Sequence, residues 1–157
     1  MKRITRLFSL LLMAGIALLY VGCDDDPSKS EEETQLDKLR GTWNIQSVDN
    51  DGTSRTDEYP DMTVTISGTF TTGGIYSYTS DATSWPSVSP WKALDSWKFK
   101  SSDVLRTITR QSDLVDMTYT LSNSDNTLTI DFVYTGAGFN NARTESVSGD
   151  WSFVFTK

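Results

Sequence analysis

The 157-residue chain contains a single cysteine, Cys23, and no histidine. One cysteine cannot form an intramolecular disulfide. Without histidine, the chain can assemble neither a Ser-His-Asp or Cys-His nucleophile system nor a His-ligated zinc site. Any catalysis would have to use carboxylates, a Ser-Lys pair or tyrosine.

The carboxylates are numerous but scattered along the chain. Two of them facing one groove could hydrolyse a glycoside. However, Asp95, Asp103, Asp113, Asp125 and Asp150 fall at predicted turns, and Asp116 and Asp131 on the outward side of predicted strands. There is also no Ser-x-x-Lys on a predicted helix, no Gly-x-Ser-x-Gly and no phosphate-binding glycine loop. The sequence therefore predicts no enzyme activity and no cofactor.

Asp49-Asn50-Asp51-Gly52 has the beginning of a calcium-binding loop. The third aspartate position and the distant bidentate glutamate of such a loop are missing. Asn, Asp and Gly also tolerate positive φ, which a tight hairpin turn requires. We expect a turn here and no metal site.

Two tryptophans lie in a segment bounded by proline and serine. Trp85 and Trp91 belong to the longest predicted connection, about 80–94, with Tyr76 and Tyr78 just before it. Exposed near the mouth of a barrel, these four aromatic residues could form a lid or stack on a sugar. A long loop can equally fold back and bury its indoles as a plug.

The other tryptophans favour a structural role. Trp43, Trp97 and Trp151 are in phase with apolar neighbours in predicted strands. Each side chain buries on the order of 200 Å² when it packs in a core. We expect these three residues in the core.

The N-terminus has the layout of a secretory signal. Lys2, Arg3 and Arg6 form a cationic head, and the uncharged run Leu7–Gly22 follows. Sixteen residues are short for a permanent span, which needs about 20. A positive head before an apolar run of this size is typical of a cleaved signal.

The end of this run, Gly22-Cys23, resembles the lipobox of bacterial lipoproteins, although Tyr20 stands where an aliphatic residue is usual. The resemblance implies cleavage before Cys23 and attachment of diacylglycerol and a further acyl chain such as palmitate to Cys23. Two or three acyl chains anchor a protein durably, at about 0.8 kcal/mol per buried methylene. Residues 1–22 are then the signal peptide, and the membrane is the first predicted partner.

Removing the signal makes the chain more acidic. Loss of Lys2, Arg3 and Arg6 from the 14 basic residues leaves 11 against 21 acidic ones, a net charge of −10. Because nucleic-acid binding depends on neutralising phosphates with Lys and Arg, we expect no nucleic-acid partner.

Residues 23–37 are predicted to be a disordered acidic linker. Asp24–Asp37 carries seven acidic residues against Lys29 alone and has no large apolar residue before Leu36, so it cannot bury surface to offset chain entropy. A helical turn or two is expected around 34–40. The aspartates after Cys23 resemble the outer-membrane export signal of Bacteroidetes lipoproteins; in enterobacteria, aspartate there instead favours inner-membrane retention.

Beyond the linker the pattern is that of antiparallel β-structure. Alternating apolar and polar residues predict strands at 62–66, 115–121, 128–134 and 151–157, and shorter ones at 42–48, 74–79, 96–100 and 104–110. Period-two alternation places one face of each strand on a core and the other in water. Ser122–Asn126 predicts a hairpin between 115–121 and 127–134. About eight strands in one domain, 38–157, are expected.

Leu39-Arg40-Gly41-Thr42-Trp43 resembles the Gly-x-Trp opening of lipocalin-like barrels. With the lipobox, the acidic linker and the closing Gly149-Asp150-Trp151-Ser152-Phe153, the chain is similar to small lipocalin-like lipoproteins of Bacteroidetes. The resemblance implies an all-β, eight-stranded up-and-down barrel. It also suggests Arg143 for the conserved arginine that stacks on the first tryptophan. Alternation alone leaves a β-sandwich open.

These expectations define three functions for an envelope protein anchored in a membrane, most consistent with the outer membrane. The first is non-enzymatic binding of a small apolar or amphipathic ligand inside the barrel. The second is a structural or protein-interaction role with a filled barrel. The third is carbohydrate binding through Trp85 and Trp91.

Overall fold

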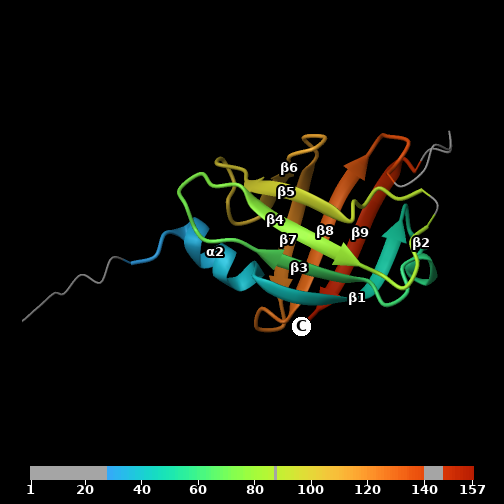
Figure 1. The fold of residues 1–157 in the computed structure, drawn as a ribbon, viewed down its shortest axis with the longest axis horizontal. Helices are drawn as coiled ribbons and strands as arrows, with labels where there is room; N and C mark the ends of the chain where they lie inside the picture. The colour runs from blue at the N-terminus through green and yellow to red at the C-terminus, as the bar shows by residue number, and fades with distance from the viewer. Residues whose placement is uncertain (1–27, 87, 140–146) are drawn as a thin grey trace, which may run out of the picture.

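The computed structural model describes residues 28–86, 88–139 and 147–157. They form the helix α2 (Glu31–Leu39), the short 3-10 helix η2 (Thr56–Glu58) and nine β-strands (Figure 1). The predicted signal peptide, Cys23 and Arg143 lie outside the described residues.

The strands make one continuous antiparallel sheet that closes on itself. They are β1 (Gly41–Asn50), β2 (Thr53–Ser54), β3 (Thr63–Ser67), β4 (Tyr76–Asp81), β5 (Leu94–Phe99), β6 (Thr107–Arg110), β7 (Asp116–Ser122), β8 (Thr127–Tyr134) and β9 (Gly149–Thr156). From β3 onward each strand pairs with the next, β3 pairs with β1, and β9 returns to β1. The predicted eight-stranded barrel is confirmed; β2 is an extra strand hairpinned to β1, and no second sheet forms a sandwich.

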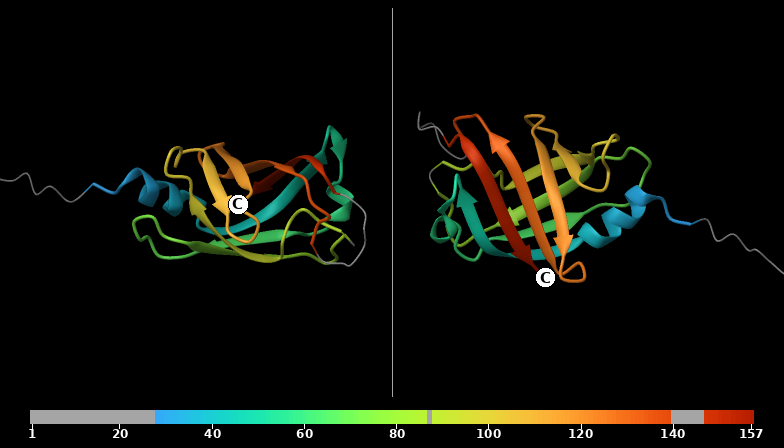
Figure 2. Two further views of the ribbon diagram at one scale, coloured as in Figure 1. Left: turned by 90° about the horizontal axis from the view of Figure 1, so that it is seen from above. Right: turned by 180° about the vertical axis from the view of Figure 1, so that it is seen from behind.

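The register follows the alternation of the sequence. In β7 and β8 the pair Tyr119 and Ile130 is buried, whereas Thr118 opposite Asp131 faces outward. Trp43, Trp97 and Trp151 are at most 5% exposed, which confirms their predicted place in the core. The barrel is flattened: β3, β4 and β5 lie on one side and β7, β8 and β9 on the other (Figures 1 and 2).

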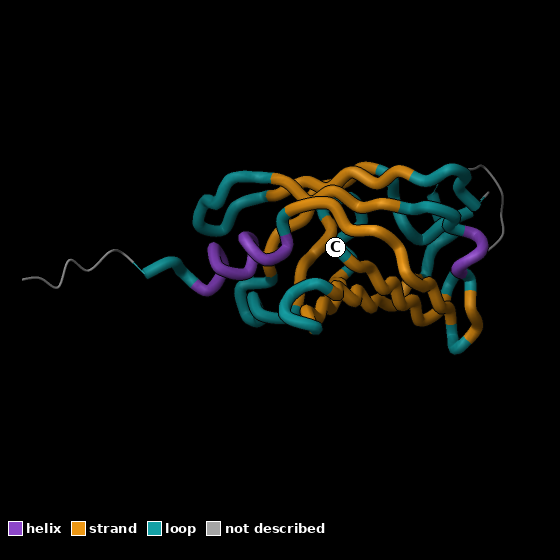
Figure 3. Tube along the Cα trace, turned by 90° about the horizontal axis from the view of Figure 1, so that it is seen from below, coloured by secondary structure: helices purple, strands orange, loops and turns teal. Residues whose placement is uncertain are grey.

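Helix α2 corrects the predicted linker. Residues 31–37 are helical, and the helix contacts one end of the barrel (Figure 3). The Ser30 hydroxyl caps the helix by accepting from the Glu33 N–H at 3.1 Å. Three glutamates in the first turn also suit the positive end of the helix dipole. Burial of Leu36 and Leu39 provides the apolar contact that the rest of the acidic run lacks. Among the described residues, no helix is long and apolar enough to cross a membrane.

The first tryptophan fixes α2 to the barrel. The fully buried Trp43 donates its indole N–H to the Leu39 carbonyl at 2.8 Å. The Lys157 ammonium lies 4.2 Å from the centre of the Trp43 ring and donates to the Lys38 carbonyl. A cation from the end of the chain therefore does stack on this indole, and Lys157 provides it.

We expect Trp43→Phe to lower the free energy of unfolding by about 1–3 kcal/mol, because it leaves the Leu39 carbonyl without its indole donor. Chemical denaturation measures the loss. Trp85→Phe is the matched control, since the Trp85 indole N–H has no hydrogen-bond partner among the described residues; we expect it to cost much less. Equal losses for the two variants would contradict the role of the Trp43 hydrogen bond.

Candidate functional site

The interior of the barrel is occupied by a side chain from a loop. Trp91, in the connection between β4 and β5, is 1% exposed. Its ring centre lies 4.8 Å from that of Phe153, 5.5 Å from that of Tyr78 and 5.7 Å from that of Phe155. Of the two fates predicted for the loop, Trp91 takes the buried one.

Several polar contacts hold the loop in place. The Trp91 indole N–H donates to the Ser80 hydroxyl at 2.8 Å. The Ser89 hydroxyl accepts from the Trp91 backbone N–H and lies 3.0 Å from the Tyr59 hydroxyl. Ser89 also forms a backbone bridge with Phe139. These bonds satisfy the buried polar groups that a loop inside a barrel would otherwise leave unpaired.

The four aromatic residues singled out from the sequence do not form one exposed platform. Tyr76 and Tyr78 are 2% and 5% exposed on the inner side of β4. Trp85 is half-buried, with its ring 6.3 Å from that of Tyr59 in an edge-to-face contact. Only Trp85 therefore keeps part of its surface open to solvent.

The space left inside the barrel is very small. A cavity of about 20 Å³ lies between Trp91, Tyr78, Trp97 and the aliphatic side chains around them. Ligand pockets in proteins typically measure about 300–1,000 Å³. With Trp91 in place, this cavity among the described residues is too small for a small-molecule ligand of ordinary size.

An ion pair between the buried Arg110 and the partly exposed Asp113 lies at the same end of the barrel. The fully buried Arg110 donates from Nε and Nη2 to the Asp113 carboxylate at 3.0 and 2.6 Å, and from Nη1 to the Pro90 carbonyl at 3.0 Å. Its guanidinium carbon lies 5.2–5.8 Å from the ring centres of Phe132, Tyr134 and Phe139. Arg110 thus links the β6–β7 turn to the loop that carries Trp91.

The electrostatics of this end follow from burial and from Arg110. Burial alone would raise the pKa of Asp113, but the hydrogen bonds and charge of Arg110 lower that pKa below its ordinary value. Burial raises the pKa of Tyr78 well above its usual range, which keeps the phenol neutral. The Tyr78 hydroxyl lies near Arg110 yet makes no hydrogen bond of normal geometry.

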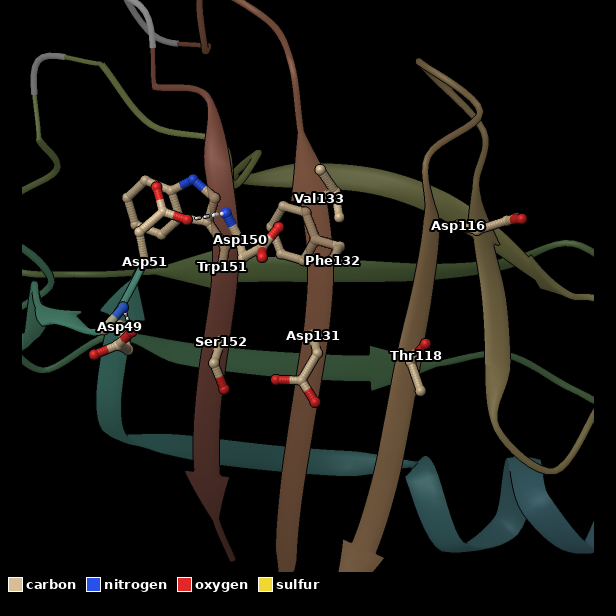
Figure 4. A pocket seen from close by; sticks show the side chains of 11 residues that line it. Asp49, Asp51, Asp116, Thr118, Asp131, Phe132, Val133, Asp150, Trp151 and Ser152 are labelled. Atoms are coloured by element: carbon tan, nitrogen blue, oxygen red, sulfur yellow. Dashed lines mark hydrogen bonds between the residues drawn. The ribbon is translucent and has the colours of Figure 1, made fainter.

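A second feature lies on the outer face of β1, β7, β8 and β9. A wide groove of about 590 Å³ is lined there by acidic and hydroxyl side chains, among them Asp49, Asp51, Asp116, Asp131 and Asp150. Figure 4 shows Thr118, Asp131 and Ser152 side by side on three neighbouring strands, as their register requires. Among the described residues, no group of three or more acidic or other metal-binding side chains is placed to hold a metal ion.

Some of these features were absent from the sequence-based expectations. Arg110 ends the predicted strand 104–110, two residues after the apolar Ile108, so period-two alternation itself places it on the inner side, with Asp113 three residues away as its partner. The acidic groove could not be anticipated, because Asp49 on β1 joins Asp131 and Asp150 on β8 and β9 only through barrel closure. Asp49–Gly52 forms the predicted hairpin turn, in which the Asp49 carboxylate accepts from the Gly52 N–H at 2.7 Å.

Comparisons with known proteins identify no relative: no protein-family model, no curated protein and no solved structure matches the chain.

We expect Asp113→Asn to lower the free energy of unfolding at pH 7 by about 2–4 kcal/mol, because it leaves a buried guanidinium without its counter-ion. The folded-state pKa of Asp113 is depressed, so its stabilisation is full above the unfolded pKa, near 4, and is lost as the pH falls through the folded pKa. The difference between wild type and variant should therefore be constant from pH 7 to 5 and shrink below about pH 4.

Urea denaturation across this pH range measures the effect. Asp131→Asn is the matched control, since Asp131 is exposed on β8 and has no hydrogen bond or ion pair among the described residues; we expect almost no change. A penalty for Asp113→Asn that stays constant down to pH 2.5 would show that the Asp113 charge is not what matters.

Proposed function

We propose that this chain is a cell-envelope lipoprotein, held on a membrane by lipidated Cys23, whose filled barrel is a non-enzymatic interaction module. The observation that carries the interaction role is the loop tryptophan inside the barrel. With Trp91 seated among Tyr78, Phe153 and Phe155, the cavity that the described residues leave beside it measures about 20 Å³. Contacts with other envelope components would then be made by the outer surface.

The sequence before the barrel supports the membrane anchor. The uncharged run Leu7–Gly22 ends directly at the only cysteine, and acidic residues follow at once. The proposed site of action is the outer membrane, as the resemblance to Bacteroidetes lipoproteins implies. The acidic mature chain also argues against a nucleic-acid partner.

The anchor is tested by expressing the full chain in a bacterium that processes lipoproteins and supplying labelled palmitate. We expect label in the wild type, and a mass that corresponds to loss of residues 1–22 and addition of lipid. Cys23→Ser should abolish labelling and leave an unprocessed precursor. Labelling that persists in Cys23→Ser, or an unlabelled wild type, would contradict the anchor.

A second candidate is the binding of a small apolar or amphipathic ligand inside the barrel after Trp91 has moved out. One specific arrangement favours it. The indole that fills the interior comes from a connection and not from a strand, and beside it the Tyr78 hydroxyl is buried without a hydrogen bond. Displacement of Trp91 would expose an apolar wall with one free polar group, as ligand pockets often have.

Trp91→Ala tests whether this indole fills the interior, as both candidates require. We expect the free energy of unfolding of this variant to be about 3–5 kcal/mol lower than that of the wild type, because a cavity replaces the indole. Free indole should restore part of the loss by binding the cavity, as measured by thermal unfolding at increasing indole concentration. Trp85→Ala, the control at a half-buried position, should lose less and not respond to indole.

The wild type provides the decisive comparison. A filled barrel predicts no stabilisation of the wild type by indole and no co-purified small molecule in native mass spectrometry. A bound ligand of defined mass would favour the second candidate and contradict the first. Carbohydrate binding through the Trp85–Trp91 pair is not favoured, since Trp91 presents no open face to a sugar.

A further inference from the structure

Three exposed aliphatic side chains lie along the outer side of β4 to β6. Ile75 precedes β4, Leu94 begins β5 and Leu114 lies in the turn after β6; they are 63%, 62% and 71% exposed. Pairing of Tyr76 with Trp97 places Ile75 beside Lys98 on the outer surface. Lys98 and Leu114 also line one groove of about 460 Å³.

Leu114 has an unusual backbone. Its φ of 60° lies in the left-handed region, which bulky residues rarely adopt. Asparagine or glycine would take this conformation at lower cost and without exposing an apolar side chain. A leucine held there, almost wholly in solvent, suggests that its side chain has a partner outside the domain.

The same side of the barrel carries positive charge. Lys98 has no ion-pair or hydrogen-bond partner among the described residues. Lys100 also lines the groove and pairs with Asp116 at its border. We call the surface formed by Ile75, Lys98, Lys100 and Leu114 the β4–β6 face; Leu94 lies at the other end of β5, opposite Thr79.

The opposite side of the barrel is acidic. The groove over β1, β7, β8 and β9 contains five aspartates and no basic residue. Asp116, at its β7 edge, pairs with Lys100, whereas Asp49, Asp51, Asp131 and Asp150 have no ion pair among the described residues. Figures 1 and 2 place β4 and β5 on one broad side of the flattened barrel and β8 and β9 on the other. A negatively charged surface would therefore attract the β4–β6 face and repel the far side, which selects one orientation.

The tether begins close to the β4–β6 face. In α2, the Glu32 carboxylate accepts from the backbone N–H of Gly73, which itself lines the groove with Lys98 and Leu114. Cys23 precedes Glu31 by eight residues, a span of at most about 28 Å when fully extended. A lipid on Cys23 would therefore keep this face within reach of the bilayer.

We propose that the β4–β6 face docks on the anionic phospholipid surface of the membrane in which the chain is anchored. The aliphatic side chains enter the interfacial region while the lysines contact lipid phosphates. This docking rests on the proposed lipid anchor. It leaves the acidic groove facing away from the bilayer, toward envelope partners.

The test uses the mature lipidated chain in vesicles of phosphatidylcholine and phosphatidylglycerol. Lipidation consumes the only native thiol, so a single new cysteine can be labelled with a nitrobenzoxadiazole fluorophore. Leu114→Cys carries the label on the β4–β6 face, and Thr129→Cys, on the outer side of β8, is the control. Spin-labelled phospholipids should quench the fluorophore at position 114 about threefold or more above position 129. In the chain labelled at position 114, the further substitutions Lys98→Gln and Lys100→Gln should lower the docked population by up to about thirtyfold. Replacing the vesicles by ones of phosphatidylcholine alone, which carry no net charge, should lower the docked population to a similar extent.

Circular dichroism verifies that each variant is folded. Equal quenching at positions 114 and 129, or quenching at 114 that ignores both the lysines and the lipid charge, would overturn the proposal. The intact mass of the protein shows whether the lipid anchor or only the docking has failed. A chain without lipid refutes both the anchor and the docking, whereas a lipidated chain without selective quenching refutes the docking alone.

Discussion

The packing of Trp91 against the inner rings of the barrel is the interaction on which the rest of the structure depends. Its ring contacts Tyr78, Phe132, Phe153 and Phe155, which come from three strands on opposite sides of the barrel. A barrel of this size encloses space that must be filled by side chains or by a ligand. Because a loop residue fills it, the loop must be fastened, and the Ser80, Ser89 and Arg110 contacts provide this.

Arg110 shows what that fastening requires. A fully buried guanidinium is costly unless its charge and donors are satisfied. Here Asp113 supplies the counter-charge, Pro90 a carbonyl and Phe132 one of three surrounding rings. Through these contacts Arg110 connects β6 to the turn that follows it and to the loop that carries Trp91.

Much of the fold, and less of the candidate site, could be predicted from the sequence. The alternation in 115–121 and 128–134 predicted both strands and the hairpin between them. It also limits their register, because a one-residue slip would turn Tyr119 and Ile130 outward. The helical turn expected around 34–40 is present, but the helix begins earlier, at Glu31. Its first turn was missed, because a run of three glutamates is typical of a linker and the contact of Leu36 and Leu39 with the barrel is not visible in local composition. The fate of Trp91 was left open for the same reason: a loop sequence does not reveal how much room the distant Phe153 and Phe155 leave for an indole.

The return of β9 to β1 would also matter if the proposed lipid anchor holds the chain on a membrane. A lipid anchor would hold copies of the chain in two dimensions, at local concentrations far above those in solution. An open sheet would then offer the unpaired N–H and C=O groups of its first and last strands to its neighbours, which is a route to strand exchange and aggregation. Pairing of Asn44–Asn50 with Trp151–Thr156 occupies those groups within one copy. Crowded neighbours would therefore find no open backbone edge where β1 and β9 pair.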